Sequence, residues 1–174
     1  MDDLYGCKLN RFNFPGDGIP IAYKLKAQGI KPKCITKTYK NITMCKLVLI
    51  DDNPIDHYIM RTMLHNNDAC KQATYTFDGS MILEYIEENR STAEKLPDVI
   101  FLDLTMPDFS GWELLDRFEQ MKNSFNKNIE VYVMTSSVRE SDKERSSQYK
   151  CVNSFISKPL SKQTLNYICE HSIS

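Results

Sequence analysis

Residues 46–54 read KLVLIDDNP, and residues 99–103 read VIFLD. In each stretch four apolar residues run together without a polar break, and an aspartate follows them directly. Unbroken apolar runs of this length are typical of strands that are buried on both faces of a sheet. After the first run, Asn53 suits the N-cap of a helix and Pro54 suits its first turn. The two stretches therefore predict buried strands that end in acidic loops.

Outward from these stretches, strand and helix patterns alternate along the chain. Parallel strands need crossover helices, and right-handed crossovers place helices on both faces of the sheet. The pattern therefore predicts an α/β fold with a doubly wound, five-stranded parallel sheet in three α/β/α layers. We expect strands at 46–50, 73–77, 99–102, 131–134 and 154–156, and helices around 55–64, 81–86, 112–121, 140–149 and 160–168.

The composition is that of an ordinary globular protein. The chain has 174 residues, of which 41% are hydrophobic and 26% are charged, and its formal net charge is −1. Near-neutral overall charge favours neither nucleic-acid nor membrane binding. No apolar run approaches the roughly 20 residues that span a bilayer, and the N-terminus has no apolar core of a secretory signal. We expect a cytoplasmic protein that does not bind membranes.

Charge is distributed unevenly between two parts of the chain. Residues 1–43 carry eight basic and three acidic side chains, a net charge of +5, and hold four of the six glycines and three of the seven prolines. Residues 44–174 carry a net charge of −6 and all of the strand and helix patterns. We interpret 1–43 as a basic, poorly ordered leader and 44–174 as the folded domain, so that Met44 is a candidate translation start.

Six cysteines are scattered along the chain, at positions 7, 34, 45, 70, 151 and 169. None forms a C-x-x-C pair, and no histidine pair lies near them at metal-ligand spacing. Several lie in or beside apolar segments, where free cysteine behaves as a small hydrophobic residue. We therefore expect reduced, structural thiols.

Polar side chains follow the predicted strands at the points where the chain leaves the sheet. Asp51 and Asp52 follow the first strand, Asp103 the third, Thr135 the fourth and Lys158 the fifth. Each alone has an ordinary interpretation as a helix cap or a solvated loop residue. Together, at the carboxyl ends of parallel strands, they predict one crevice. Clustered carboxylates repel one another unless a cation intervenes, and carboxylates with Mg²⁺, lysine and a hydroxyl suit phosphoryl transfer.

Four segments, LVLIDDNPID, PDVIFLDLTMPDFSGWELL, VYVMTSS and SFISKPL, together resemble the receiver domain of two-component response regulators. The resemblance extends over about 44–174, and it implies a flavodoxin-like sheet with strand order 2-1-3-4-5. It also implies that Asp103 is the phosphoacceptor and that Mg²⁺ is the cofactor. In that family Asp52 would bind Mg²⁺ directly, Asp51 largely through water, Asp103 as a second carboxylate, and Thr105 through its backbone carbonyl.

The same resemblance implies roles for three further residues. Thr135 would supply the hydroxyl that turns toward the phosphoryl group, although Ser136 is adjacent. Lys158 would pair with the phosphorylated carboxylate, and its bond to Pro159 would be cis. Phe155 stands where the family has its switch aromatic, often tyrosine, so that a hydrogen bond from that ring is absent here.

These observations lead to one main functional hypothesis and two alternatives. The main hypothesis is a stand-alone, non-enzymatic bacterial receiver that accepts a phosphoryl group from a sensor histidine kinase or histidine phosphotransfer protein and then binds an unidentified protein target, without binding DNA. Only one helix fits between Pro159 and residue 174, so we expect no output domain in this stretch. The alternatives are a Mg²⁺-dependent phosphohydrolase with an aspartyl-phosphate intermediate and a degenerate docking module. The phosphohydrolase alternative would require an Asp-x-Asp pair that begins at Asp103. This chain does not have that pair, because residue 105 is threonine.

Overall fold

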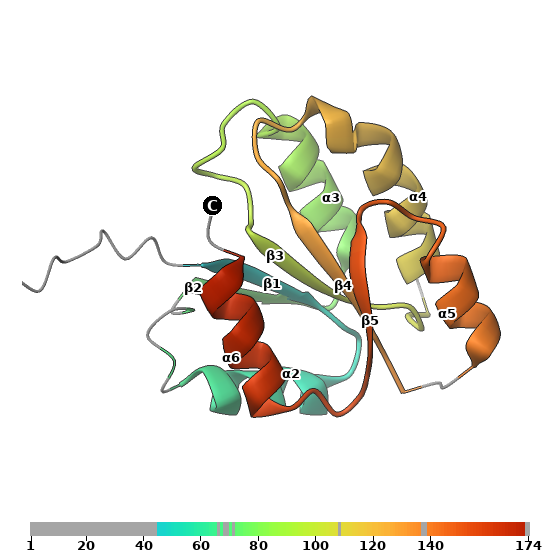
Figure 1. The fold of residues 1–174 in the computed structure, drawn as a ribbon. Helices are drawn as coiled ribbons and strands as arrows, with labels where there is room; N and C mark the ends of the chain where they lie inside the picture. The colour runs from blue at the N-terminus through green and yellow to red at the C-terminus, as the bar shows by residue number, and fades with distance from the viewer. Residues whose placement is uncertain are drawn as a thin grey trace, which may run out of the picture. The chain divides into compact units, whose positions relative to one another are not determined.

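The computed structural model describes residues 45–65, 67, 70, 72–107, 109–136 and 139–172. The predicted leader and Met44 lie outside these residues. Five parallel strands form one sheet in the order β2-β1-β3-β4-β5, which confirms the predicted fold and strand order (Figure 1). The strands are β1 (Lys46–Ile50), β2 (Gln72–Thr76), β3 (Val99–Asp103), β4 (Glu130–Thr135) and β5 (Val152–Ser157).

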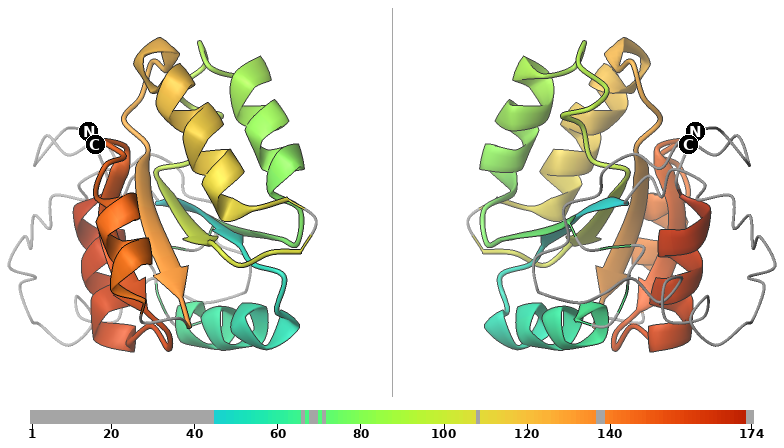
Figure 2. Two further views of the ribbon diagram at one scale, coloured as in Figure 1. Left: turned by 90° about the vertical axis from the view of Figure 1, so that its right-hand side faces the viewer. Right: turned by 90° about the vertical axis from the view of Figure 1, so that its left-hand side faces the viewer.

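Helices cover both faces of this sheet (Figure 2). On one side α3 (Gly79–Glu88) and α4 (Gly111–Met121) pack on an apolar cluster with alternate residues of β1 and β3. On the other side α2 (Pro54–Leu64) and α6 (Lys162–His171) enclose a second cluster. β3 is buried along its whole length. Helices on both faces explain this burial, because a central parallel strand then has no solvent-facing side.

A short helix, α5 (Glu140–Ser146), lies beside α4. The guanidinium carbon of Arg145 lies 4.0 Å from the centre of the Trp112 ring, an attractive cation–π contact. The Tyr149 hydroxyl also donates a hydrogen bond to Asp116 on α4, at 2.5 Å. These contacts join α4 to α5 and to the turn after it through exposed or half-buried side chains rather than through the buried core.

The boundaries of most elements agree with the sequence pattern. Asn53 is the N-cap of α2 and accepts a hydrogen bond from the Ile55 amide at 3.0 Å, as predicted. α5 is shorter than the predicted 140–149, because the chain tightens at its end. The amides of Gln148 and Tyr149 bond to carbonyls three residues earlier, which replaces the α-helical pattern by a tighter turn.

No described helix is long and apolar enough to cross a membrane.

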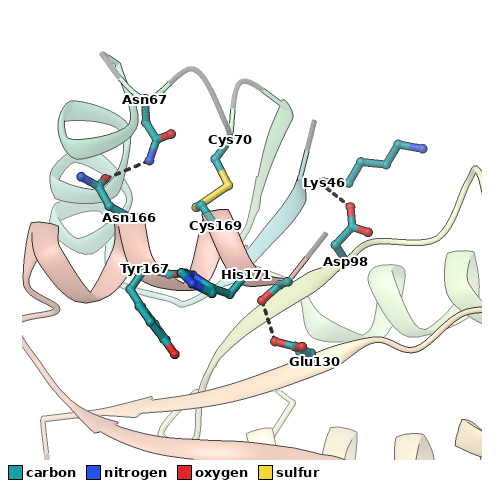
Figure 3. The surroundings of a disulfide bond; sticks show 10 residues. Lys46, Asn67, Cys70, Asp98, Glu130, Asn166, Tyr167, Cys169 and His171 are labelled. Atoms are coloured by element: carbon teal, nitrogen blue, oxygen red, sulfur yellow. Dashed lines mark hydrogen bonds between the residues drawn. A yellow bond between two sulfur atoms is a disulfide. The ribbon is translucent and has the colours of Figure 1, made fainter. Parts of the chain in front are cut away.

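The expectation of reduced thiols is wrong for two cysteines, because Cys70 and Cys169 form a disulfide (Figure 3). Their Cα atoms lie 5.9 Å apart although 99 residues separate them in sequence. Both side chains belong to the cluster between the sheet and α6, where packing brings the segment before β2 against that helix. Cys45 and Cys151 are buried free thiols, and burial raises the pKa of each to about 12. Cys7 and Cys34 lie outside the described residues.

We expect Cys169→Ser to lower the free energy of unfolding by about 2–5 kcal/mol, because the bridge closes a long loop in the unfolded chain. Denaturant unfolding under non-reducing conditions measures this loss. Cys70→Ser should give a similar loss and the double variant little more, since both remove the same bond. Equal stabilities of the wild-type chain with and without dithiothreitol would contradict the prediction.

Candidate functional site

A hollow of about 440 Å³ lies at the carboxyl edge of the sheet. The ends of β1, β3, β4 and β5 and the first turn of α2 supply its walls, as the predicted convergence at strand ends requires. Its lining residues are Asp52, Asn53, Asp56, Asp103, Thr105, Ser136 and Lys158. A larger groove of about 700 Å³ lies beside β2 and α3, but Glu94 is the only carboxylate among its described lining residues. The acidic hollow is therefore the candidate site.

The Lys158 ammonium lies at the centre of this site. Its Nζ donates to Asp103 Oδ2 at 2.6 Å, to Asp51 Oδ2 at 2.7 Å and to Asp56 Oδ2 at 3.0 Å. An ammonium has three protons, so these three bonds use its whole donor capacity. The lysine side chain is only 9% exposed, which strengthens each contact relative to one in water. One cation thus joins carboxylates from β1, α2 and β3.

The charges of the site shift the pKa values of both partners. Burial alone lowers the pKa of the Lys158 ammonium, but its hydrogen bonds to Asp103, Asp51 and Asp56 outweigh burial and hold that pKa well above its usual range. Burial raises the pKa of Asp51, and the nearby charge of Asp103 adds to this, although Lys158 and the Asn53 amide act in the opposite direction. The two directions are compatible, because one ammonium does not balance three carboxylates. The site therefore retains an excess of negative charge.

Backbone groups hold the two buried carboxylates in place. The Asn53 amide donates to Asp51 Oδ1 at 2.9 Å, and the Thr105 amide donates to Asp103 Oδ1 at 2.9 Å. In each case the second oxygen of the carboxylate faces Lys158. The strand ends thus fix both side chains before any ligand is bound.

Gly111, the first residue of α4, allows the loop after β3 to pass close to Asp103. A Cβ atom at this position would lie 2.3 Å from the Asp103 carbonyl oxygen and 2.7 Å from the Leu104 Cα. Both are backbone atoms, so no side-chain rotation relieves the contact. This close backbone approach is the steric reason for a glycine at position 111.

Three carboxylates of the site are arranged as a cation-binding group. Ligand oxygens of Asp51, Asp52 and Asp103 lie within 4.8 Å of one another. Asp52 is exposed, whereas the other two are buried. Oxygen donors are the ligands that hard divalent cations prefer, and Mg²⁺ is commonly held by one or two carboxylates with waters and phosphate oxygens. The donor set therefore fits Mg²⁺.

Thr135 and Phe155, two of the other predicted residues, do not line the hollow. Thr135 is the last residue of β4 and is buried, and its carbonyl accepts a hydrogen bond from the Lys158 amide at 2.9 Å. Ser136, rather than Thr135, is among the residues that line the hollow. Phe155 in β5 is half-buried against the cluster under α3 and α4. The Lys158–Pro159 peptide bond is cis, which confirms that prediction.

Sequence reasoning missed two residues of this site because neither lies at a strand end. Asp56 reaches Lys158 from the first turn of α2, and its position three residues after the Asn53 cap was the available signal. His57 is buried, contacts the Asp51 carbonyl oxygen through Nε2 at 2.8 Å, and stacks on Phe77 with ring centres 4.4 Å apart. The apolar pattern of this helix does not predict that its histidine contacts the Asp51 carbonyl oxygen.

Comparison with known protein families identifies the family and the fold. The family model of the response regulator receiver domain matches residues 47–170. The chain belongs to this family. The match includes every strand except the first residue of β1, and it includes every residue that lines the acidic hollow.

Known receivers resemble this receiver domain in sequence and structure. The two-component response regulator ORR1 of Oryza sativa subsp. japonica is 29% identical over 122 residues, which are 66% of this chain and 49% of ORR1. A two-component response regulator from Cytophaga hutchinsonii has a TM-score of 0.65 at 25% identity, over 74% of this chain and 96% of that one. The phosphorylated cyanobacterial phytochrome response regulator RcpA has a TM-score of 0.59 at 27% identity, over 74% and 90%. This chain spans about half the length of ORR1.

We expect Mg²⁺ to bind this receiver more weakly as the pH falls. A protonated Asp51 cannot act as a ligand, and its raised pKa means that protons compete at higher pH than for an ordinary aspartate with a pKa of 3.8. Isothermal titration calorimetry between pH 7.5 and about pH 4.5 measures the dissociation constant. Asp51→Asn should show a flatter pH dependence. A dissociation constant that does not change over this range would contradict the prediction.

We also expect Gly111→Ala to lower the free energy of unfolding by about 1–3 kcal/mol or more, because the loop backbone must move. Gly79→Ala is a matched control in another helix N-terminus. Its Cβ would meet the ends of the Leu114 and Phe109 side chains at 3.0 and 3.1 Å, and these side-chain atoms need to shift by only a few tenths of an ångström. Denaturant unfolding of both variants tests the difference, and an equal loss in the two would refute the steric explanation.

Proposed function

We propose that this receiver accepts a phosphoryl group on Asp103 from a phosphohistidine of a sensor histidine kinase or histidine phosphotransfer protein. The observation that carries the proposal is the position of Asp103. Its carboxylate lies in an acidic hollow, 2.6 Å from the Lys158 ammonium and beside the carboxylates of Asp51 and Asp52. Membership of the receiver family and the likeness to a phosphorylated regulator support it.

The transfer makes one bond and breaks one. An Asp103 carboxylate oxygen attacks the phosphorus, the phosphorus–nitrogen bond breaks, and the electron pair remains on the imidazole nitrogen of the donor. Held by Asp51, Asp52, Asp103 and the Thr105 carbonyl, Mg²⁺ would supply positive charge against the phosphoryl oxygens. Lys158 offsets the remaining negative charge on Asp103. Because its position is fixed beforehand, this lysine needs no costly rearrangement during transfer.

Phosphorylation then changes the charge beside β4 and β5. A phosphorylated side chain carries about −1.5 to −2, with three strong acceptor oxygens. We infer that the Thr135 hydroxyl turns toward these oxygens and that Phe155 follows into the space it leaves. Phe155 is half-buried, so this rotation does not need to open the core. The surface formed by α5, β5 and α6 would then present a different shape to a protein target.

We further infer that the domain comprises 44–174, that 1–43 is a basic leader, and that the domain signals by binding a protein rather than by catalysing a reaction or binding DNA. The proposed phosphohistidine donors obtain their phosphoryl group from ATP, so we infer that the transfer takes place in the cytoplasm. Disulfides are rare in that reducing compartment, and burial that keeps reductants away from the sulfur atoms favours the persistence of one there. Cys70 and Cys169 are 1% and 0% exposed, which supports such shielding.

Acetyl phosphate with Mg²⁺ tests the proposal directly. We expect the full chain to gain about 80 Da, the mass of one phosphoryl group, and Asp103→Asn to gain nothing. Intact-mass spectrometry under neutral conditions makes the measurement. Asp142→Asn, which removes a carboxylate from the first turn of α5, is the control and should be modified like the wild-type chain.

Other outcomes would favour the alternatives. Continuous turnover of phosphate esters by the wild-type chain, lost in Asp103→Asn, would indicate a phosphohydrolase. Absence of the adduct at saturating Mg²⁺ would indicate a docking module. Either result would overturn the proposed phosphoacceptor function.

A further inference from the structure

Asp56 differs from the other two carboxylates that bind Lys158. Asp51 and Asp103 belong to the three-carboxylate group that fits a divalent cation, whereas Asp56 does not. Asp56 also comes from a helix rather than from a strand end. A cation or a phosphoryl group at Asp103 would therefore change the contacts that Asp51 and Asp103 make with Lys158. Among the described carboxylate partners of the ammonium, Asp56 is the one whose contact would stay the same.

The Asp56 carboxylate is held from two directions. Its Oδ2 accepts a hydrogen bond from Asn53 Nδ2 at 3.0 Å and another from Lys158 Nζ at 3.0 Å. Asn53 is itself fixed, since its Oδ1 caps the Ile55 amide and its own amide binds Asp51. The first turn of a helix also favours a negative charge. Asp56 is only 21% exposed, so these contacts are partly shielded from solvent.

Charge balance gives this contact its role. If Asp51 and Asp103 hold a divalent cation, their negative charge would be shared between that cation and Lys158, and the two positive charges would repel each other. A further carboxylate that binds the ammonium without belonging to the ligand group offsets that repulsion. Asp56 lies at hydrogen-bond distance from Nζ and outside the ligand group, which is the arrangement needed.

We propose that Asp56 is a positioning residue that keeps the Lys158 ammonium beside Asp103 during phosphoryl transfer. The effect of Asp56 on the phosphorylation rate rests on the proposed phosphoacceptor function. The contact between Asp56 and Lys158 does not depend on that function. Asp56 acts through Lys158 and has no direct role on the phosphoryl group. Its removal should therefore matter only while Lys158 is present.

The rate test uses the full chain, acetyl phosphate and saturating Mg²⁺. We expect Asp56→Ala to slow phosphorylation of Asp103 about tenfold, since a hydrogen bond to a charged group contributes on that scale. Asp56→Asn keeps an acceptor oxygen without the charge and should fall between Asp56→Ala and the wild-type chain. Asp56→Glu restores the charge and should recover part of the rate. Glu140→Gln, which removes an exposed carboxylate from the first turn of α5, should match the wild-type chain.

A double-mutant cycle separates positioning from a general effect on folding or charge. In the Lys158→Ala background, Asp56→Ala should slow the reaction by less than about twofold, because the residue through which it acts is missing. Equal tenfold losses in both backgrounds would overturn the proposal. A wild-type rate for Asp56→Ala would overturn it as well.

A second readout does not depend on phosphorylation. In chains labelled with ¹⁵N-lysine, the buried Lys158 ammonium should exchange its protons slowly with water, and Lys158→Ala identifies its signal. We expect exchange to be about tenfold faster in Asp56→Ala and faster by a smaller factor in Asp56→Asn, with and without Mg²⁺, but unchanged in Glu140→Gln. Unchanged exchange in the Asp56 variants would overturn the proposal. If the wild-type chain accepts no phosphoryl group, the proposed function fails alone, and the exchange rates still decide the position of Lys158.

Discussion

One ammonium among three carboxylates is the interaction on which the carboxyl edge of this sheet depends. β1 and β3 are neighbours in the sheet, but β4 separates β3 from β5, which leads into Lys158. Only a long side chain reaches from the end of β5 to the aspartates that follow the central strands. Without that cation, buried Asp51 and Asp103 would face each other with uncompensated charge, which is strongly unfavourable in a shielded site.

The loops around this ion cluster serve it through backbone groups. Amides of Asn53 and Thr105 orient the carboxylates, and the close passage at Gly111 sets the course of the chain after β3. His57 adds a contact to the Asp51 carbonyl from within α2. The chemistry thus depends on side chains whose positions are set by the ends of the strands and by the start of one helix.

Much of this arrangement could be predicted from sequence, because parallel strands bring their carboxyl ends to one edge. The apolar runs before Asp51 and Asp103 located two central strands, and the residues after the runs located the site. The Cys70–Cys169 bridge could not be predicted, since only tertiary packing brings residues 99 positions apart together. Asp56 was missed for a related reason. Its role depends on how α2 is oriented over the sheet edge, and helical periodicity does not encode that orientation.

The contact between α4 and α5 has a practical consequence. Trp112 is the only tryptophan of the chain, and its ring lies under the Arg145 guanidinium and 6.2 Å from the Tyr149 ring centre. Because the chain has one tryptophan and nine tyrosines, only fluorescence excited selectively in tryptophan reports on this one junction. Displacement of α5 from α4 would change the surroundings of that ring, so the tryptophan emission of the natural chain reports on the contact between these two helices.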